Sequence, residues 1–235
     1  VHLGRDTSPV KSSPFQGGHK MKFGIIIVFF LTLNVRAENK KSLEFSAKNW
    51  TTVAYKKIKP NTVKFENNSM IVEVNSSASP LVYKLSTPQS VTGFRVVGEL
   101  TGFKKTESGK FDEDSVLRVG LVTVGKNKLT GIKKMIAADW VKRLFALAPE
   151  GTGLDKIYFY NFSDRAELVK KNRLLPKSDL IDETVITAVR LGKSQQDKKY
   201  ESTTVKYEHQ YSLAAPKETA ALWLSIDGDD TKSQY

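Results

Sequence analysis

Apolar and polar residues alternate along most of the chain after residue 37, a pattern typical of strands with one buried face. The alternation is clearest in residues 70–75, 115–124 and 221–227. Shorter runs of the same kind predict further strands at residues 43–47, 81–85, 91–100, 156–162, 184–191 and 203–212. Gly, Pro, Asn and Ser residues separate these runs. The pattern predicts an all-β fold, an antiparallel β-sandwich or jelly roll.

One segment departs from this alternation. In residues 131–147, apolar side chains recur at steps of three and four: Ile132, Met135, Ile136, Trp140, Leu144 and Leu147. The spacing predicts one substantial amphipathic helix, ended by Pro149 and Gly151. We expect it to close one end of the sandwich, to lie over one sheet, or to cover a binding face. Its cationic flanks leave a helix on a membrane surface as the alternative.

Residues 21–37, MKFGIIIVFFLTLNVRA, combine an early lysine, an apolar run and small residues at the end. The run is too short to span a bilayer, and Val35 and Ala37 suit a signal peptidase that cuts before Glu38. We therefore predict a signal peptide and a periplasmic or secreted protein. Residues 1–20 precede Met21. We interpret them as an untranslated leader, with a polar N-terminal extension as the alternative. Residues 38–235 are then one β-sandwich domain.

The charge of the chain changes the expected partners. The chain has 37 basic and 25 acidic residues; five basic and one acidic fall in residues 1–37, so that residues 38–235 keep a net charge of +8. An exported basic protein meets anionic lipid head groups, acidic wall polymers or extracellular nucleic acid. We expect a polysaccharide or an anionic cell-envelope component as partner, with no specific nucleic acid and no transmembrane segment after cleavage.

Catalytic chemistry has few candidates. The sequence has no cysteine and, after residue 37, only His209, so thiol nucleophiles and multi-histidine metal sites are excluded there. His209 alternates with tyrosines on one face of a predicted strand, which favours a structural role. Asp227, Asp229 and Thr231 have the spacing that opens a calcium loop, but Lys232 stands where such a loop has glycine. A calcium ion at the sandwich edge, a carboxylate pair with Arg118 and a solvated turn stay open, and we expect no other cofactor.

Four segments, taken in order, resemble a bacterial family of exported proteins known only as a domain of unknown function with a jelly-roll-like sandwich. They are NSSASPLVYKL at 75–85, FRVVGEL at 94–100, FDEDSVLRVGLVTV at 111–124 and ALWLSIDGDDTKSQY at 221–235. The chain departs from the family where Phe94 and Val96 replace expected tryptophans. The family members continue into one more strand, so the resemblance also implies a C-terminal truncation that leaves an open sheet edge or an apolar groove.

The resemblance implies a polar cluster at one end of the sandwich. Its members are Asp114 and Arg118 from the middle motif, and Asp227, Asp229 and Thr231 from the last one. The family has no established activity, so the resemblance bears on the fold more than on the function.

Two function classes follow. The preferred one is a non-catalytic binding module for carbohydrate or a cell-envelope polymer, in which aromatic rings stack on sugars. We expect Trp223 and Asp227 on the non-core side of the last strand, and Tyr158 and Tyr160 on one face of another, to bind the ligand. The alternative is a hydrolase or lyase that acts on polysaccharide through carboxylates or a tyrosine.

Overall fold

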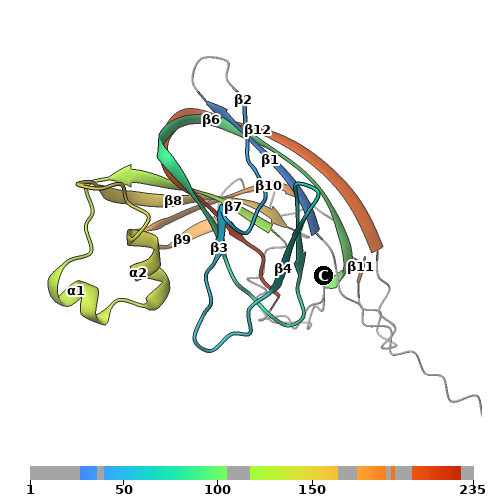
Figure 1. Ribbon diagram of the computed structural model, residues 1–235, viewed down its shortest axis with the longest axis horizontal. Coiled ribbons are helices and arrows are strands. Elements are labelled where there is room, and N and C mark those ends of the chain that lie inside the picture. Colours follow the sequence, from blue (N-terminus) through green and yellow to red (C-terminus); the bar gives the residue numbers. More distant parts are fainter. Residues whose placement is uncertain are drawn as a thin grey trace, which may run out of the picture.

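The computed structural model describes residues 27–35, 40–104, 117–163, 174–188, 192–193 and 203–228. Most of these residues are in strands (Figure 1). The strands are β1 (Ile27–Val35), β2 (Lys40–Ser42), β3 (Trp50–Thr52), β4 (Thr62–Glu66), β5 (Ser69–Glu73), β6 (Leu81–Lys104), β7 (Leu117–Gly125), β8 (Gly153–Ser163), β9 (Leu174–Ser178), β10 (Ile181–Ala188), β11 (Gly192–Lys193) and β12 (Thr203–Ser225). They form one 12-stranded sheet whose main path is β4-β5-β1-β6-β12-β7-β8-β10-β9. The all-β, sandwich-like fold expected from the alternation is confirmed.

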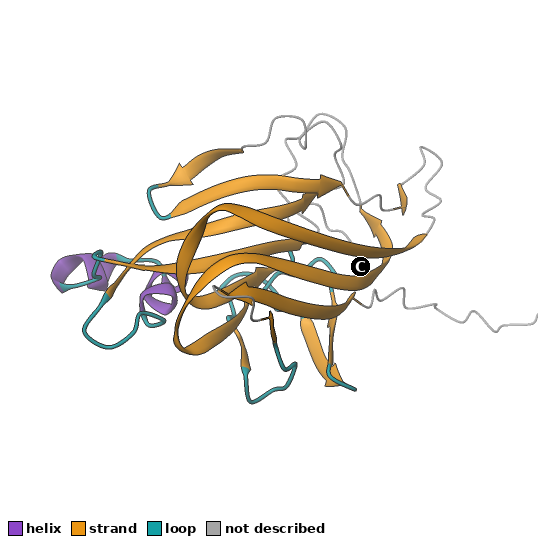
Figure 2. Cartoon of the chain, turned by 90° about the horizontal axis from the view of Figure 1, so that it is seen from above, coloured by secondary structure: helices purple, strands orange, loops and turns teal. Residues whose placement is uncertain are grey.

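Strands β6 and β12 are much longer than the others and bend together, which folds the one sheet into two layers (Figures 1 and 2). Their antiparallel register shifts between Ser212 and Lys217 and again between Thr219 and Ala221. Pro88 and Pro216 lie in these stretches, where proline has no amide to donate to a neighbouring strand. At the bend a Cβ on Gly93 would lie 2.4 Å from the carbonyl oxygen of Tyr211, so only glycine fits there.

The main core lies between the two layers. One layer contains β4, β5, β1 and the adjoining halves of β6 and β12; the other contains their remaining halves with β7, β8, β10 and β9. Aromatic rings join the layers: Phe94 of β6 lies 5.3 Å from Tyr160 of β8, and Tyr211 of β12 lies 4.9 Å from the same ring (centroid distances). The layer that holds β7 and β8 carries a second apolar cluster on its outer side, which includes Val122, Trp223 and Leu144.

Two short helices lie where the sequence predicted one long helix, and only the second of them packs on the outer cluster. They are α1 (Gly131–Ile136) and α2 (Asp139–Phe145). Ala137 and Ala138 separate them in extended conformations, with ψ angles of 143° and 150°. The prediction of a single helix over 131–147 is therefore wrong, because these two extended residues interrupt the chain of i to i−4 hydrogen bonds. The sheet also contains two parallel pairs, β10 with β8 and β11 with β6, among its antiparallel ones.

The segment that we expected to lie outside the domain is part of the sheet. Strand β1 pairs with β6 from Val28 opposite Glu99 to Val35 opposite Val91, and with β5 on its other side. Leu31 and Leu33 are buried in the main core. An apolar run rich in β-branched residues suits a buried strand as well as a signal sequence, and periodicity does not separate the two. Cleavage before Glu38 stays a prediction, and a chain cut there lacks β1.

Candidate functional site

A pocket of about 520 Å³ lies beside β3, the first residues of β6 and the end of α2. Its volume is in the range of small-ligand sites. The lining residues are Lys41, Lys48, Asn49, Thr51, Val53, Val82, Tyr83, Lys84, Ser86, Arg143, Ala146 and Leu147. We call this the basic pocket, because four of these side chains are cationic.

One wall of the basic pocket is held in place by Trp50. Its ring is buried, stacks on Phe45 at a centroid distance of 5.6 Å and tilts against Tyr83 at 5.2 Å. Its indole Nε1 donates a hydrogen bond of 3.1 Å to the carbonyl oxygen of Glu44. These contacts fix the segment before β3, so that Lys48 and Asn49 are presented at the pocket.

The floor and the opposite wall come from β6 and α2. Residues 82, 84 and 86 alternate with the inward-facing Leu81 and Leu85, so their side chains lie on the outer side of the layer. Val82 packs in the outer apolar cluster together with Leu144 of α2. The burial of Leu144 anchors α2 on the sheet and brings Arg143 to the pocket.

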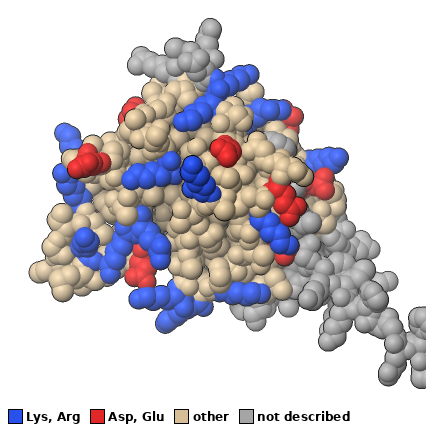
Figure 3. All heavy atoms as spheres, in the orientation of Figure 1, with Lys and Arg blue, Asp and Glu red and all other residues tan. Residues whose placement is uncertain are grey.

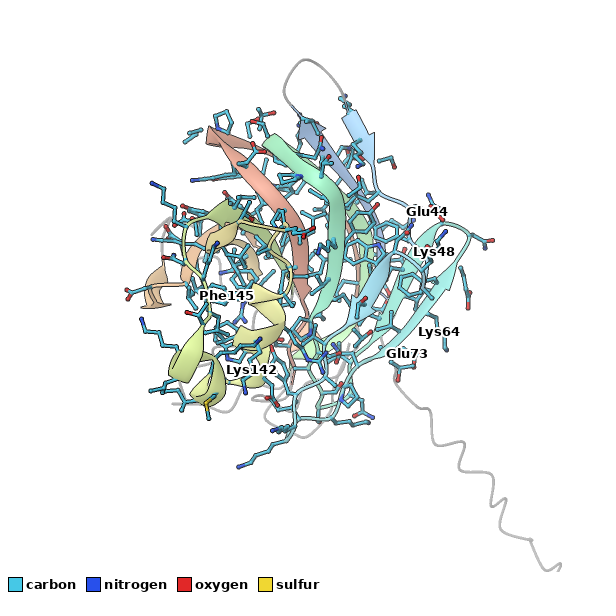
Figure 4. All side chains as sticks on the ribbon, turned by 60° about the vertical axis from the view of Figure 1, so that its left-hand side comes forward. Glu44, Lys48, Lys64, Glu73, Lys142 and Phe145 are labelled. Atoms are coloured by element: carbon cyan, nitrogen blue, oxygen red, sulfur yellow. The ribbon has the colours of Figure 1, made fainter. Side chains whose placement is uncertain are left out.

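The charged side chains that line the basic pocket are all positive. Its lining residues include four cations and no carboxylate. Glu44 accepts a hydrogen bond of 3.1 Å from the Asn49 amide but does not line the pocket. Figure 4 shows Glu44 and Lys48 on the segment before β3, and Lys142 and Phe145 on α2. A concave surface lined by one sign of charge concentrates ligands of the opposite sign.

Trp223 and Tyr160 do not form the exposed aromatic surface that we expected. Trp223 lies on the side of β12 that faces away from the main core, as expected, but it is 3% exposed because it packs in the outer apolar cluster. Tyr160 is 6% exposed and lies in the main core. Burial of its phenol raises the pKa of Tyr160. Both rings are covered because both faces of this layer are packed, one by the other layer and one by α2.

Tyr158 shares the inner face of β8 with Tyr160 but is half-buried. Its hydroxyl donates a hydrogen bond of 3.3 Å to Asp155, and the Lys217 ammonium lies 3.8 Å from the ring centroid. Burial raises the pKa of Tyr158, and the Asp155 carboxylate adds to the shift. The ring face is thus occupied by a cation of the same chain.

The expected polar cluster is partly present. Arg118 Nη1 donates to Asp227 Oδ2 at 2.7 Å, in an ion pair whose side chains are only 18% and 12% exposed. Ser225 Oγ also donates to this carboxylate, at 3.2 Å to Oδ1. Arg118 is opposite Ser225 on β12 and Asn161 on β8, and buried Asn161 donates to Glu183 at 3.1 Å. Asn161 and Glu183 were missed by the sequence analysis, since nothing in the sequence reveals the pairing of β8 with β10.

The remaining predicted members, Asp114, Asp229 and Thr231, lie outside the described residues. The expected C-terminal groove also concerns that part of the chain. Within the described residues, no group of three His, Cys, Asp or Glu side chains is placed to hold a metal ion. The calcium prediction depends on residues 229 and 231, and it stays a prediction.

The cations of the basic pocket were also missed. Lys41, Lys48, Lys84 and Arg143 come from four separate segments, and each is an ordinary basic residue in its local sequence. The excess of basic over acidic residues was the one signal in the sequence for an anionic ligand, and it did not indicate which residues would bind that ligand.

No protein-family model, curated protein or solved structure matches the chain. None of the described helices is both long and apolar enough to cross a membrane.

Proposed function

We propose that this protein is an exported, non-catalytic binding module that takes an anionic saccharide segment of a cell-envelope polymer into the basic pocket. The observation that carries the proposal is a pocket of about 520 Å³ with four cations and no carboxylate among its lining residues. An uncharged sugar gains only ordinary hydrogen bonds from four cations, whereas a sugar with carboxylate or phosphate groups gains charge-assisted ones.

The other lining residues suit the sugar itself. Asn49, Thr51 and Ser86 offer side chains that donate and accept hydrogen bonds. A small number of polar groups around an apolar floor is the usual composition of a ligand site. Val53 and Val82 supply that floor.

A hydrolase or lyase that acts on such a polymer remains the alternative class. It needs an acid and a base at the sugar. The lining of the basic pocket holds neither a carboxylate nor a histidine, and the ring of its tyrosine, Tyr83, packs against Trp50, which favours binding over hydrolysis at this site. The resemblance to a family of exported β-sandwich proteins agrees with an envelope location and names no reaction.

The test uses oligogalacturonate, in which each sugar carries a carboxylate, and its methyl ester, which is neutral. Calorimetry at low salt is expected to show binding of the acid and not of the ester. Lys84→Gln and Arg143→Gln are each expected to weaken binding about three- to tenfold, since each removes one charged hydrogen-bond donor. Lys206→Gln is the matched control, because Lys206 is exposed on the other layer and does not line the pocket.

Equal binding of acid and ester would contradict an anionic ligand. A loss in Lys206→Gln as large as that in Lys84→Gln would show that the whole surface charge, rather than the basic pocket, attracts the polymer. Release of reducing ends from the oligosaccharide would favour the enzyme alternative.

A further inference from the structure

Helix α1 exposes three large apolar side chains. Ile132, Met135 and Ile136 are 75%, 78% and 79% exposed, and they are the exposed large hydrophobics of the described chain. No residue of α1 is buried. Their spacing of i, i+3 and i+4 places all three on one face of the helix. Apolar side chains gathered in this way mark an interaction site more often than scattered ones do.

The shape of the chain makes α1 protrude. Extended Ala137 and Ala138 separate α1 from α2, which is anchored on the sheet through Leu144. Figures 1 and 2 show the two helices at one end of the molecule, with α1 as the outer one. The apolar face of α1 is therefore free to meet another surface without a change in the fold.

Cations surround this apolar face. Lys133 and Lys134 are exposed on α1 itself, and Lys142 reaches back to the carbonyl oxygen of Met135 at 3.3 Å. Residues 126–151 contain six basic and two acidic side chains. One of the two acids, Asp139, is paired with Lys56 at 3.1 Å. On the face drawn in Figure 3, Lys and Arg side chains are more widespread than Asp and Glu.

From this combination we infer that α1 docks on the surface of a lipid bilayer that contains anionic lipid, with Ile132, Met135 and Ile136 inserted at the level of the head groups. A small number of apolar side chains with lysines nearby suits a membrane surface. There, weak insertion of the apolar side chains and attraction of the lysines to anionic lipid act together. A stable protein interface needs a larger area than one helical turn offers. Arg143 follows on α2, so docking would hold the basic pocket close to the lipid surface.

The inference is independent of the proposed ligand, and flotation with vesicles tests it. Vesicles of phosphatidylcholine with phosphatidylglycerol are expected to bind the protein at least about tenfold more strongly than vesicles of phosphatidylcholine alone. The triple variant I132S/M135S/I136S is expected to lose at least about tenfold of this binding. Lys133→Gln and Lys134→Gln are each expected to lose about fivefold, the contribution of one lysine near an anionic surface.

A fluorescent probe shows whether α1 itself enters the lipid. The chain has no cysteine, so Met135→Cys gives a single labelling site for an environment-sensitive dye. We expect a blue shift with anionic vesicles for Met135→Cys and none for Lys206→Cys, which places the dye on the other layer. Thermal melts of all variants serve as the folding control, since the substituted side chains are exposed.

Three results would overturn the inference. Unchanged vesicle binding by the triple serine variant would exclude α1 as the anchor. Loss of binding in Lys84→Gln and Arg143→Gln, with the triple variant unaffected, would place the lipid head group in the basic pocket instead. Concentration-dependent self-association that disappears in the triple variant, without vesicle binding by the unaltered protein, would assign the apolar face to a second copy of the chain.

Discussion

Strand β1 and helix α1 both carry large apolar side chains, yet β1 lies between β5 and β6 with Leu31 and Leu33 buried, whereas α1 has no buried residue. The backbone explains part of this difference. A strand finds hydrogen-bond partners only in its neighbours, while a helical turn bonds within itself, as Ala137 N–H does to the Lys133 carbonyl at 3.1 Å. Burial of β1 therefore completes the sheet, whereas the groups at the ends of α1 that have no partner within the helix can bond to water because α1 is exposed.

The strongest way to break this comparison is to remove β1. A chain that begins at Glu38 lacks the strand that pairs with both β5 and β6, and it exposes the core residues that Leu31 and Leu33 cover. We expect it to lose its cooperative thermal transition and to bind a hydrophobic dye, because an open sheet edge and an apolar groove remain. Near-ultraviolet circular dichroism during heating, with a chain that begins at Met21 as control, measures this.

The same experiment bears on the predicted signal peptide. If the exported protein begins at Glu38 by mass spectrometry and still unfolds cooperatively, β1 is dispensable and the sheet closes without it. Cleavage of the signal peptide would remove the nine residues of β1, whereas the sheet needs them. Both predictions cannot hold for one mature chain unless another segment takes the place of β1.

A pair of alanine variants sharpens the comparison. Leu33→Ala removes a fully buried side chain and is expected to lower the free energy of unfolding by about 2–5 kcal/mol. Ile132→Ala removes a side chain that is 75% exposed and is expected to change it by less than about 0.5 kcal/mol, with a slight gain from the helix propensity of alanine. Urea unfolding measures both. Equal losses would mean that α1 is packed in solution.

Ion pairs extend the comparison from apolar to charged side chains. Asp227→Asn removes the negative charge that Arg118 contacts at 2.7 Å, in a site where both side chains are largely buried, and we expect a loss of about 3 kcal/mol. Glu73→Gln breaks the exposed pair with Lys64, whose nitrogen and oxygen are 2.9 Å apart, and we expect no measurable change in urea unfolding. If the exposed pair contributes as much as the buried one, burial is not what separates the two regions.

The sequence predicted most strands with one buried face well and strands that bend poorly. Residues 43–47 were predicted as a strand but lie after the end of β2, although Leu43 and Phe45 are buried in the main core. Residues 70–73 of the first run are confirmed in β5 and residues 117–124 of the second in β7, while residues 115–116 lie outside the described residues. Residues 81–85 and 91–100 were predicted as two strands but belong to the single strand β6, because Pro88 and the polar residues beside it resemble a turn. The two halves of β12 were separated for the same reason at Pro216. A bent strand and a turn have similar local composition, and only the long-range pairing separates them.

The candidate site was predicted less well than the fold. The Arg118 and Asp227 pair followed from charge and from the resemblance, and the structure confirms it. The basic pocket did not follow from the sequence, because Lys41 and Arg143 are brought together by the packing of α2 on the outer cluster. Alternation gave the correct face for Trp223 but not its burial, because it does not reveal that both faces of β12 are covered.

The smallest expected effect concerns His209, which lies on the inner face of β12 near rings of the main core. Its imidazole is 5.8 Å from the Phe162 ring and 6.5 Å from the Tyr211 ring (centroid distances), and burial lowers the pKa of His209 below its ordinary value of 6.5. The folded state therefore favours the neutral imidazole. When the pH falls through 6.5, the unfolded chain takes up the proton first, so the contribution of His209 to stability is full above that value and is lost below it. His209 is the one histidine in the described part of the chain, which isolates this dependence between about pH 5.5 and 7.5.

We expect the melting temperature to fall as the pH is lowered across this interval, and His209→Gln to remove part of the fall. A variant with the same pH dependence as the unaltered protein would show that His209 is as solvated as it is in the unfolded chain, and that the inner face of β12 is more open than the buried surroundings of β1.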